Sequence, residues 1–381
     1  MTGASTDLSG ESERFELPLK APLSTAAGTI KSRDGLLVWI HGGGGNGGDA
    51  PVGVGEATPL PGWTESLEEC QAAVDRALDR LEAHGPEAAL AEASGAPAAR
   101  HGVSLALLDR EARASGEPLY RHVGKADQDV VSSVPVNATV GDGRIMETVG
   151  MALEAVRDGF GTLKVKVGAR ETAIDAERLE AIRSEVSDTV GHKFVEEFAT
   201  PGWRISPSSH SRQYEDLRLR VDANGAWSRS EARLAIDAFP DLEYVEQPLA
   251  PDDLAGHADL RSRATIALDE TLIEHAVEDV IDAGAADVLV LKPMVLGGID
   301  RAWTAAMEAR EAGIDPVVTT TIDGVVARTA AVHLAAGLEI DRACGLATAD
   351  RLDTDLAPDP TRIFEGRISV PQAPGIGVSV E

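Results

Sequence analysis

The sequence predicts an α/β protein in which a closed parallel βα barrel follows a smaller α+β domain. Two observations support this prediction. From residue 134 onward, short apolar segments alternate with helical patterns. Charged residues end several of these segments, and from Asp222 to Lys292 they recur at intervals of 24, 23 and 23 residues. A strand, a helix and their loops occupy a similar length in a barrel, where the ends of several strands share one site.

The first part of the chain favours strand hairpins followed by helices. Residues 14–60 alternate between apolar and polar side chains, and the HGGGGNGGD stretch at 41–49 lies between two such runs. No Gly-Lys-Ser/Thr and no helix start follow this stretch, so we interpret it as a hairpin insertion rather than a phosphate-binding loop. A Ser-x-x-Glu capping box and regularly spaced apolar residues predict a helix over 66–83. A second helix is expected over 102–115.

The rest of the chain predicts the barrel. Its strand candidates are short apolar runs at 134–140, 162–167, 217–222, 242–246, 265–269, 287–292, 315–320 and, more weakly, 343–348. The interval between the second and third candidates is too long for one helix, and its excess falls at 191–216, which we expect to be an insertion. We therefore predict the smaller domain at 1–130, with a return of the chain to it at about 355–381, and the barrel domain at 131–354.

Composition excludes several classes of function. The formal net charge of −28 is too acidic for a nucleic-acid-binding protein and poorly suited to an anionic membrane surface. Apolar residues make up 43% of the chain, which argues against disorder. Cys70 and Cys344 show no disulfide framework and no metal-binding spacing. No apolar run reaches membrane-spanning length and the N-terminus lacks a signal-peptide core, so we expect a cytoplasmic protein.

The chain holds only seven lysines, and three of them lie at the ends of predicted barrel strands. An acidic surface poor in lysine is typical of halophilic proteins, whose carboxylates repel one another at low salt. We therefore expect this protein to lose structure at low ionic strength. Thermal unfolding at low and at molar KCl measures this effect, and a melting temperature that does not depend on KCl would contradict it.

Two of these lysines stand two positions apart in one strand candidate. Lys164 and Lys166 therefore point the same way, and we expect that way to be into the barrel, between Leu163, Val165 and Val167. Neighbouring ammonium groups lower each other's pKa, and partial burial lowers it further. One of the two lysines can then act as an unprotonated general base near neutral pH. A pair of surface lysines on an edge strand is the alternative, which the scarcity of lysine disfavours.

Three carboxylates, Asp222, Glu246 and Asp269, end later strand candidates. Hard oxygen ligands suit Mg²⁺ or Mn²⁺ better than zinc, and a divalent cation relieves the repulsion among three like charges. Separate helix caps or surface carboxylates are the alternative, which the regular spacing and the apolar strands disfavour. Lys292 ends the next candidate and completes the ring opposite Lys166. We call this set the strand-end residues: Lys164, Lys166, Asp222, Glu246, Asp269 and Lys292.

Several sequence blocks resemble the enolase superfamily, in family order and along nearly the whole chain. They are APLSTAAGTIKSRDGLLV, GVGEATPLPGWTESLEE, LLDREARASGEPLYRHVG, the KVK run, DANGAW, VEQPL, LDE, LKP and VPQAPGIGV. The resemblance implies a modified (β/α)7β TIM-like barrel with an α+β capping domain. The first two blocks resemble that domain's mobile specificity loop and its core. A sixth-strand lysine is typical of the muconate-lactonising subgroup, and DPVVTTTIDG lacks the histidine of the mandelate-racemase subgroup.

The resemblance also implies a role for each strand-end residue. Lys166 would be the base, and Lys292 would be its counterpart across the ring. Lys164 would tune Lys166 and help to hold the substrate carboxylate. The three carboxylates would bind Mg²⁺, with Mn²⁺ as the alternative ion: Asp222, Glu246 and Asp269.

Within the subgroup, VPVNATV, TTTIDGVVARTAAVHLAA and GLATADRLDTDL look most like the o-succinylbenzoate synthases. This resemblance implies a carbon–oxygen lyase of menaquinone biosynthesis, which dehydrates a succinyl-hydroxycyclohexadiene carboxylate to an aromatic product. Lys166 would take the proton α to the carboxylate, hydroxide would leave from the same face, and Lys292 would stabilise the intermediate. The candidate substrate-binding residues are Ser24, Thr319, Thr320 and Thr321. Trp63 is interpreted as either a substrate contact or a packing residue, and Asn224 is a candidate support for the metal ligands.

Other functions stay open on the same sequence. In N-succinylamino-acid racemases and dipeptide epimerases, both Lys166 and Lys292 would move protons. Dipeptide epimerases hold an α-ammonium group with an Asp-x-Asp motif, which Asp353 and Asp355 match loosely, and we interpret this match as a surface turn. Muconate cycloisomerisation is less favoured, and a non-catalytic barrel scaffold is the alternative of another class. The expected partner is a small carboxylate substrate, with no nucleic acid and no membrane, and we keep a homo-oligomer open.

Overall fold

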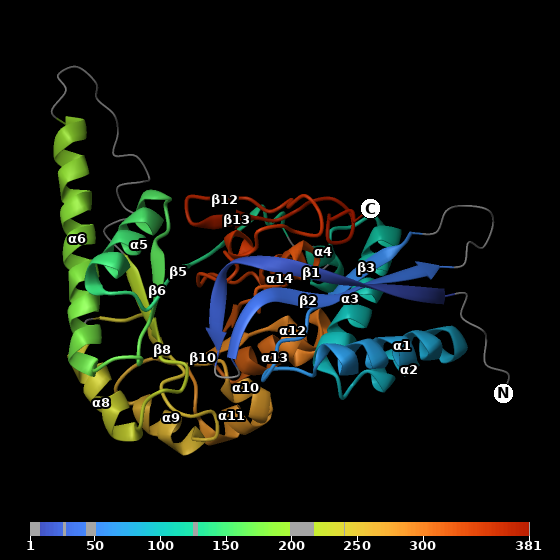
Figure 1. The fold of residues 1–381 in the computed structure, drawn as a ribbon, viewed down its shortest axis with the longest axis horizontal. Coiled ribbons are helices and arrows are strands. Elements are labelled where there is room, and N and C mark those ends of the chain that lie inside the picture. Colours follow the sequence, from blue (N-terminus) through green and yellow to red (C-terminus); the bar gives the residue numbers. More distant parts are fainter. Residues whose placement is uncertain are drawn as a thin grey trace.

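The structure is a computed structural model that describes residues 8–25, 28–42, 51–124, 129–198, 217–239 and 241–380. The side chains of residues 24, 25 and 188–198 lie outside this description. A three-stranded antiparallel sheet with its helices forms one end of the molecule, and parallel strands with their helices form the other (Figure 1). The α/β class and the barrel arrangement predicted from the sequence are confirmed.

The small domain is built on a long antiparallel hairpin. β1 (Leu8–Thr25) pairs with β2 (Gly28–Gly42), and β3 (Gly53–Ala57) pairs with the other edge of β2. The predicted hairpins are therefore confirmed, whereas most of the glycine-rich stretch between them lies outside the described residues. Four helices follow: α1 (Leu67–His84), α2 (Pro86–Glu92), α3 (Pro97–Ser115) and α4 (Leu119–Val123).

Local sequence signals explain the starts of α1 and α3. Ser66 caps α1 and forms the predicted capping box with Glu69. α3 begins earlier than predicted, because Pro97 occupies its first turn, where a missing amide hydrogen costs nothing. α3 lies directly against β3, since a Cβ on Gly55 would come within 1.9 Å of the Gly102 carbonyl oxygen. Only glycine permits this approach.

The barrel strands form one parallel sheet in the order β11-β10-β9-β8-β7-β6-β5. Each strand pairs with the next one along the chain, as repeated βα units require. The strands are β5 (Ala138–Val140), β6 (Thr162–Lys166), β7 (Arg218–Asp222), β8 (Tyr244–Glu246), β9 (Ile266–Leu268), β10 (Val288–Leu291) and β11 (Asp315–Val318).

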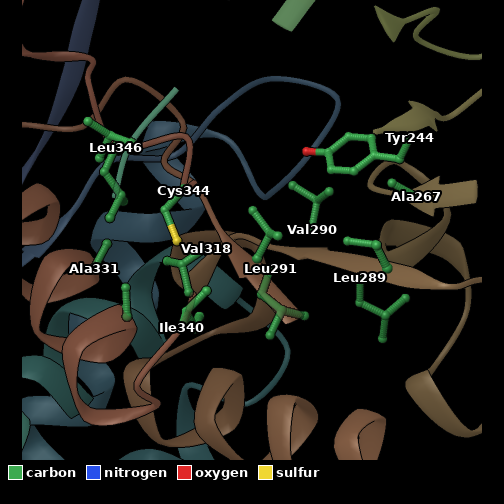
Figure 2. Packing of buried hydrophobic residues seen from close by; sticks show 14 of the residues in the cluster. Tyr244, Ala267, Leu289, Val290, Leu291, Val318, Ala331, Ile340, Cys344 and Leu346 are labelled. Carbon is green, nitrogen blue, oxygen red and sulfur yellow. The ribbon is translucent and has the colours of Figure 1, made fainter. Parts of the chain in front are cut away.

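The predicted eighth strand at 343–348 is wrong in detail, because this segment makes single bridges rather than a ladder. Cys344 pairs in parallel with Val136, just before β5. Gly345 lies against β11, where its amide donates to the Val318 carbonyl oxygen at 2.9 Å. The segment thus closes the barrel between β5 and β11, and Figure 2 shows Val318 and Cys344 packed beside each other.

The predicted first strand at 134–140 is also wrong as one element. β4 (Ser133–Pro135) pairs antiparallel with β13 (Arg367–Ser369), which pairs in turn with β12 (Ile363–Phe364). Only the second half of the predicted strand, β5, joins the barrel. Pro135 has no amide hydrogen to donate to a second neighbouring strand, which suits it to the place where the chain changes sheets.

Helices alternate with the barrel strands, and α6 runs into the segment predicted to be an insertion. It continues to Phe198, so the first part of the predicted insertion at 191–216 is helical, and residues 199–216 lie outside the described part of the chain. In Figure 1, α6 extends well beyond its neighbour α5.

No helix among the described residues is long and apolar enough to cross a membrane. The helices are α5 (Ile145–Arg157), α6 (Thr172–Phe198), α8 (Arg229–Ala238), α9 (Leu254–Leu260), α10 (Thr271–Glu274), α11 (Val277–Ala283), α12 (Pro293–Leu296), α13 (Ile299–Glu311), α14 (Val325–Gly337) and a 3₁₀ turn at Ala349–Arg351.

The C-terminal segment contacts the small domain. The Leu119 amide donates to the Gly375 carbonyl oxygen at 2.8 Å, and the Ile376 amide donates to Asp109 Oδ1 on α3 at 2.7 Å. Asp109 also accepts from the Val54 amide on β3 at 3.0 Å, so one buried carboxylate joins β3, α3 and the end of the chain. These contacts agree with a C-terminal return, while the exact domain boundaries stay a prediction.

Glu56 on β3 joins the small domain to the barrel. Its carboxylate accepts hydrogen bonds from the amides of Gly324 at 2.7 Å and Ala327 at 2.9 Å, at the N-terminus of α14. The Thr58 hydroxyl also donates to it, at 2.5 Å. Burial, together with nearby Asp323, raises the pKa of Glu56 to about 7, although these donors oppose the shift. The folded state therefore keeps a proton that the unfolded chain releases at lower pH.

Replacing Glu56 by glutamine is expected to remove a pH-dependent part of the stability. Because the folded pKa is raised, the contribution of Glu56 is complete below about pH 4.5 and is lost as the pH rises through about 7. Relative to Glu56→Gln, wild type should lose about 3 kcal/mol of unfolding free energy over this range. Urea unfolding at the two ends of the range measures the difference, with the exposed Glu68→Gln as control. A difference that stays constant with pH would contradict the expectation.

Candidate active site

The strand-end residues come together because neighbouring barrel strands are in register. Lys166, Asp222 and Glu246 occupy paired positions on β6, β7 and β8. The layer below pairs Lys164 with Arg220. Side chains two positions apart on a strand share a face, so both lysines of β6 point toward the same carboxylates.

The two lysines of β6 share these carboxylates. Lys164 Nζ lies 2.7 Å from Glu246 Oε1 and 3.1 Å from Asp222 Oδ2. Lys166 Nζ lies 2.7 Å from the same Asp222 oxygen. Asp222 and Glu246 are almost fully buried, whereas the side chain of Lys166 is 34% exposed against 13% for Lys164. Lys166 is therefore the lysine of the pair that a molecule from solvent reaches.

Lys292 and Asp269 form the other side of the site. Lys292 Nζ donates to Asp269 Oδ2 at 2.6 Å. Glu246 on β8 pairs with Ala267 on β9, two residues before Asp269, so both sides belong to one cluster. The ring centroid of Trp63 lies 3.5 Å from Lys292 Nζ, and contact of Trp63 with the substrate stays a prediction.

Asn224 lies beside the proposed base. Its side-chain oxygen accepts a hydrogen bond from Lys166 Nζ at 2.8 Å, and its amide nitrogen donates to Glu270 at 2.8 Å. The Asn224 backbone amide donates to Asp222 Oδ1 at 3.1 Å, with φ at 45°. Asparagine tolerates this left-handed conformation better than most residues. Asn224 thus contacts both Asp222 and Lys166, and its role as a support for the metal ligands stays a prediction.

Burial and crowding shift the pKa values of the three carboxyl groups. Burial raises the pKa of Glu246 to about 7, and neighbouring Asp222 adds to the effect. Burial also raises the pKa of Asp269 to about 6, against the effect of Lys292. Burial alone would raise the pKa of Asp222, but the two lysines of β6 outweigh it and hold the pKa well below the usual range.

The expectation of a lowered lysine pKa is wrong for Lys164. Burial alone would lower that pKa, but Glu246 and Asp222 outweigh burial and hold it well above the usual value. Lys164 Nζ lies 2.7 Å from Glu246 Oε1 and 3.1 Å from Asp222 Oδ2, and these negative charges favour its protonated form. The basicity of Lys164 therefore depends on how these two carboxylates are engaged.

The residues fit a divalent cation by their donor chemistry. Glu246 Oε2 is buried and has no hydrogen-bond partner among the described residues. Such an oxygen is costly to leave alone, and hard cations prefer carboxylate oxygens as ligands. Asp222 and Asp269 present further carboxylates beside it. Within the described ranges no group of three acidic, histidine or cysteine side chains is yet arranged to hold a metal ion, and each of these carboxylates instead faces a lysine.

The predicted substrate-binding threonines follow β11, and the protein itself engages their hydroxyl groups. Thr319 donates to the backbone of the segment that closes the barrel at 2.9 Å, and Thr320 shares a hydrogen bond with a facing hydroxyl at 3.0 Å. Thr321 donates to Asp323. The side chain of Ser24 lies outside the described residues. Substrate contact by these four residues stays a prediction.

Sequence reasoning missed a buried polar layer directly below the site. Arg220 is fully buried, lies 4.5 Å from the Tyr244 ring centroid and donates to Glu243 at 2.7 Å. The alternation of side chains along the strand contained the signal. Arg220 stands two positions before Asp222, just as Lys164 stands two positions before Lys166, so each pair shares one face of its strand. An arginine at such a position indicates a polar barrel interior below the strand ends.

The Asp-x-Asp match near the C-terminal side of the barrel has a structural explanation. Asp355 accepts from the Val325 amide at 2.8 Å and from the Arg328 guanidinium at 2.7 Å. Asp353 is exposed, and its amide donates to the Pro18 carbonyl oxygen at 2.9 Å. The two carboxylates are thus not presented together to a ligand, in agreement with the interpretation as a turn.

Comparison with known proteins identifies the family. The profile described as Enolase C-terminal domain-like matches residues 210–381, and the one described as MenC, N-terminal domain matches residues 11–110. The o-succinylbenzoate synthase of Thermobifida fusca is 37% identical over 254 residues, which cover 63% of this chain and 68% of that protein. The chain belongs to the enolase superfamily.

Relatives in the superfamily with other activities are similar over a larger part of the chain. The L-Ala-D/L-Glu epimerase of Bacillus subtilis is 28% identical over 384 residues, covering 97% of this chain and 95% of that protein. The crystal structure of a dipeptide epimerase from Enterococcus faecalis, complexed with Mg and the dipeptide L-Leu-L-Tyr, has a TM-score of 0.78 at 27% identity. The match covers 98% of this chain and 99% of the epimerase chain. The comparisons therefore support that this protein is an enzyme of the enolase superfamily. The proteins to which it is similar include lyases, racemases and epimerases.

Proposed function

We propose that this member of the enolase superfamily is an o-succinylbenzoate synthase-like dehydratase. The observation that carries the proposal is the match of the MenC N-terminal domain to residues 11–110, most of the small domain. The identity to the Thermobifida fusca synthase adds support. The matched region includes the turn that holds Trp63 against Lys292, so the match extends to a residue beside the proposed site.

In the proposed reaction, Lys166 removes the proton α to the substrate carboxylate. The carbon–hydrogen bond breaks, its electron pair forms the enolate and the proton is taken up by Lys166 Nζ. The hydroxyl group on the adjacent carbon then leaves from the same face with its bonding electrons and takes the proton from Lys166 Nζ as water, so that the ring becomes aromatic and the base is free again. The greater exposure of Lys166 than of Lys164 supports this assignment of the base. Lys292 contributes a positive charge from the other side of the site.

The remaining strand-end residues are proposed to prepare the site. Asp222, Glu246 and Asp269 would hold Mg²⁺, or Mn²⁺ in its place, and the ion would supply positive charge for the enolate oxygens. Lys164 is proposed to help hold the substrate carboxylate, from a position between Asp222 and Glu246. A small carboxylate is accordingly the substrate class.

An N-succinylamino-acid racemase or a dipeptide epimerase is the second candidate. The observation that favours it is the presence of lysines on both sides of the site, Lys166 and Lys292, together with the similarity to such enzymes. A dipeptide substrate is the less favoured of the two, because Asp355 is engaged with Arg328 and is not free to hold an α-ammonium group. A non-catalytic scaffold would need none of these charged groups in one buried cluster.

The test is absorbance-monitored conversion of the succinyl-hydroxycyclohexadiene carboxylate by wild type, in molar KCl with Mg²⁺. We expect dehydration to be faster than α-deuterium exchange into N-succinylamino acids or dipeptides in D₂O under the same conditions. Absence of dehydration by a folded protein that Mg²⁺ stabilises would overturn the synthase proposal. Exchange alone would favour the racemase or epimerase, and neither activity would favour the scaffold.

A further inference from the structure

Trp63 stands on a rigid turn of the small domain. Its amide donates to the Leu60 carbonyl oxygen at 2.9 Å, with Pro61 and Gly62 between them. Gly62 has φ of 86°, as the third position of a type II turn requires, and proline is common at the second. The Leu60 amide donates to the Thr64 hydroxyl at 2.9 Å and closes the turn. The turn therefore places the backbone that carries the half-buried Trp63 side chain.

The face of this ring lies against the Lys292 ammonium group. Lys292 Nζ is 3.5 Å from the Trp63 ring centroid, well within the range of a cation–π contact. On the barrel side, the same ammonium donates to Asp269 Oδ2 at 2.6 Å. An ammonium group has three N–H donors, and these two contacts fix its position from two directions. Lys292 is thus held jointly by the small domain and the barrel.

The small domain also holds the segment that follows Lys292. The Thr58 amide donates to Met294 Sδ at 3.4 Å. Arg100 on α3 donates to the Gly297 carbonyl oxygen at 2.5 Å and to both carboxylate oxygens of Asp300, at 3.0 and 2.7 Å. These contacts restrict movement of the lysine backbone relative to the turn that carries the tryptophan.

We propose that Trp63 is a positioning residue for Lys292. The inference rests on the proposed function and goes beyond it, because it gives the small domain a part in placing catalytic charge. Between Trp63 and Asp269, Lys292 acts as a stationary cation toward the enolate. Such a lysine suits an elimination, in which one lysine moves the proton, better than a racemisation, in which two lysines do.

Two substitutions of Trp63 test this role. Trp63→Leu removes the aromatic face, whereas Trp63→Phe keeps one. We expect kcat for dehydration to fall about tenfold in Trp63→Leu with KM changed by less than about twofold, and to fall less than about threefold in Trp63→Phe. An unchanged kcat in Trp63→Leu, or equal losses in both variants, would overturn the proposal. A change confined to KM would also overturn it, because that pattern indicates a substrate contact.

A second measurement does not depend on turnover. Urea unfolding of the metal-free wild type, Trp63→Leu, Lys292→Met and the double variant reports whether the two side chains are coupled. We expect the loss of Trp63 to shift the unfolding midpoint less when residue 292 is already methionine. Additive shifts would overturn the positioning role, even in an active synthase. If the shifts are non-additive but the wild-type protein does not catalyse dehydration, the positioning role is supported and only the proposed reaction is rejected.

Discussion

Lys166→Ala is expected to lower kcat for dehydration by about a thousandfold or more. Lys166 is the proposed base, and a positioned general base typically contributes a factor of this order. The variant should stay folded, because Asp222 keeps Lys164 as a partner at 3.1 Å and the rest of the cluster is unchanged. Turnover of the succinyl-hydroxycyclohexadiene carboxylate is measured at saturating substrate, and circular dichroism checks the fold.

The control for this experiment is Lys20→Ala. Lys20 is an exposed lysine on β1, and its loss changes the net charge by the same amount as the loss of Lys166. Wild-type kcat is expected for this variant. The assignment of the base would be wrong if Lys166→Ala kept kcat within about tenfold of wild type, since that loss is smaller than general-base catalysis requires.

Glu246→Gln is expected to abolish stabilisation of the protein by Mg²⁺. In wild type, the ion at a hundredfold excess over its Kd should raise the free energy of unfolding by about 2.7 kcal/mol. The variant should show almost no increase, because glutamine keeps the shape of the side chain and removes the charge on Oε2, which has no hydrogen-bond partner within the described part of the chain. In EDTA the variant should be at least as stable as wild type at neutral pH, since a buried charge beside Asp222 is gone and Lys164 still has Asp222 as partner.

The pH dependence gives this prediction a second readout. Burial raises the pKa of Glu246 to about 7, so its contribution to metal-free stability is lost as the pH rises from about 4.5 to 7. In Glu246→Gln, the free energy of unfolding without metal should not show this decrease between about pH 4.5 and 7. Calorimetric unfolding with and without Mg²⁺ measures both effects, and the exposed Glu278→Gln should behave as wild type. A full Mg²⁺-induced increase in Glu246→Gln would remove this residue from the proposed metal site.

The sequence predicted the elements that depend on local pattern. Among the described residues, apolar runs located β6 to β11 and the second half of the run at 134–140 located β5, and the regular intervals between charged strand ends indicated that those residues would meet. The capping box of Ser66 and Glu69 correctly predicted the start of α1. In each case the signal lies within a few residues of the element, so neighbouring side chains suffice to specify it.

Features that depend on distant contacts were missed or wrong. The raised pKa of Lys164 arises from carboxylates on β7 and β8, although the adjacent lysine on its own strand suggested the opposite direction. The contact between Trp63 and Lys292 and the bond from Glu56 to α14 both join the two domains, and no local pattern encodes either. The change of sheet at Pro135 depends on β13, near the other end of the chain.

The seam between β5 and β11 has a consequence for the order of folding. Single bridges at Cys344 and Gly345 close it, whereas neighbouring strands elsewhere in the barrel share runs of paired residues. These bridges join positions far apart along the chain, so the loss of loop entropy precedes any gain from them. Pairings between consecutive βα units are more local and form at lower entropic cost. Because the strand-end residues belong to those units, from β6 to β10, assembly of the site is expected to precede closure of the ring.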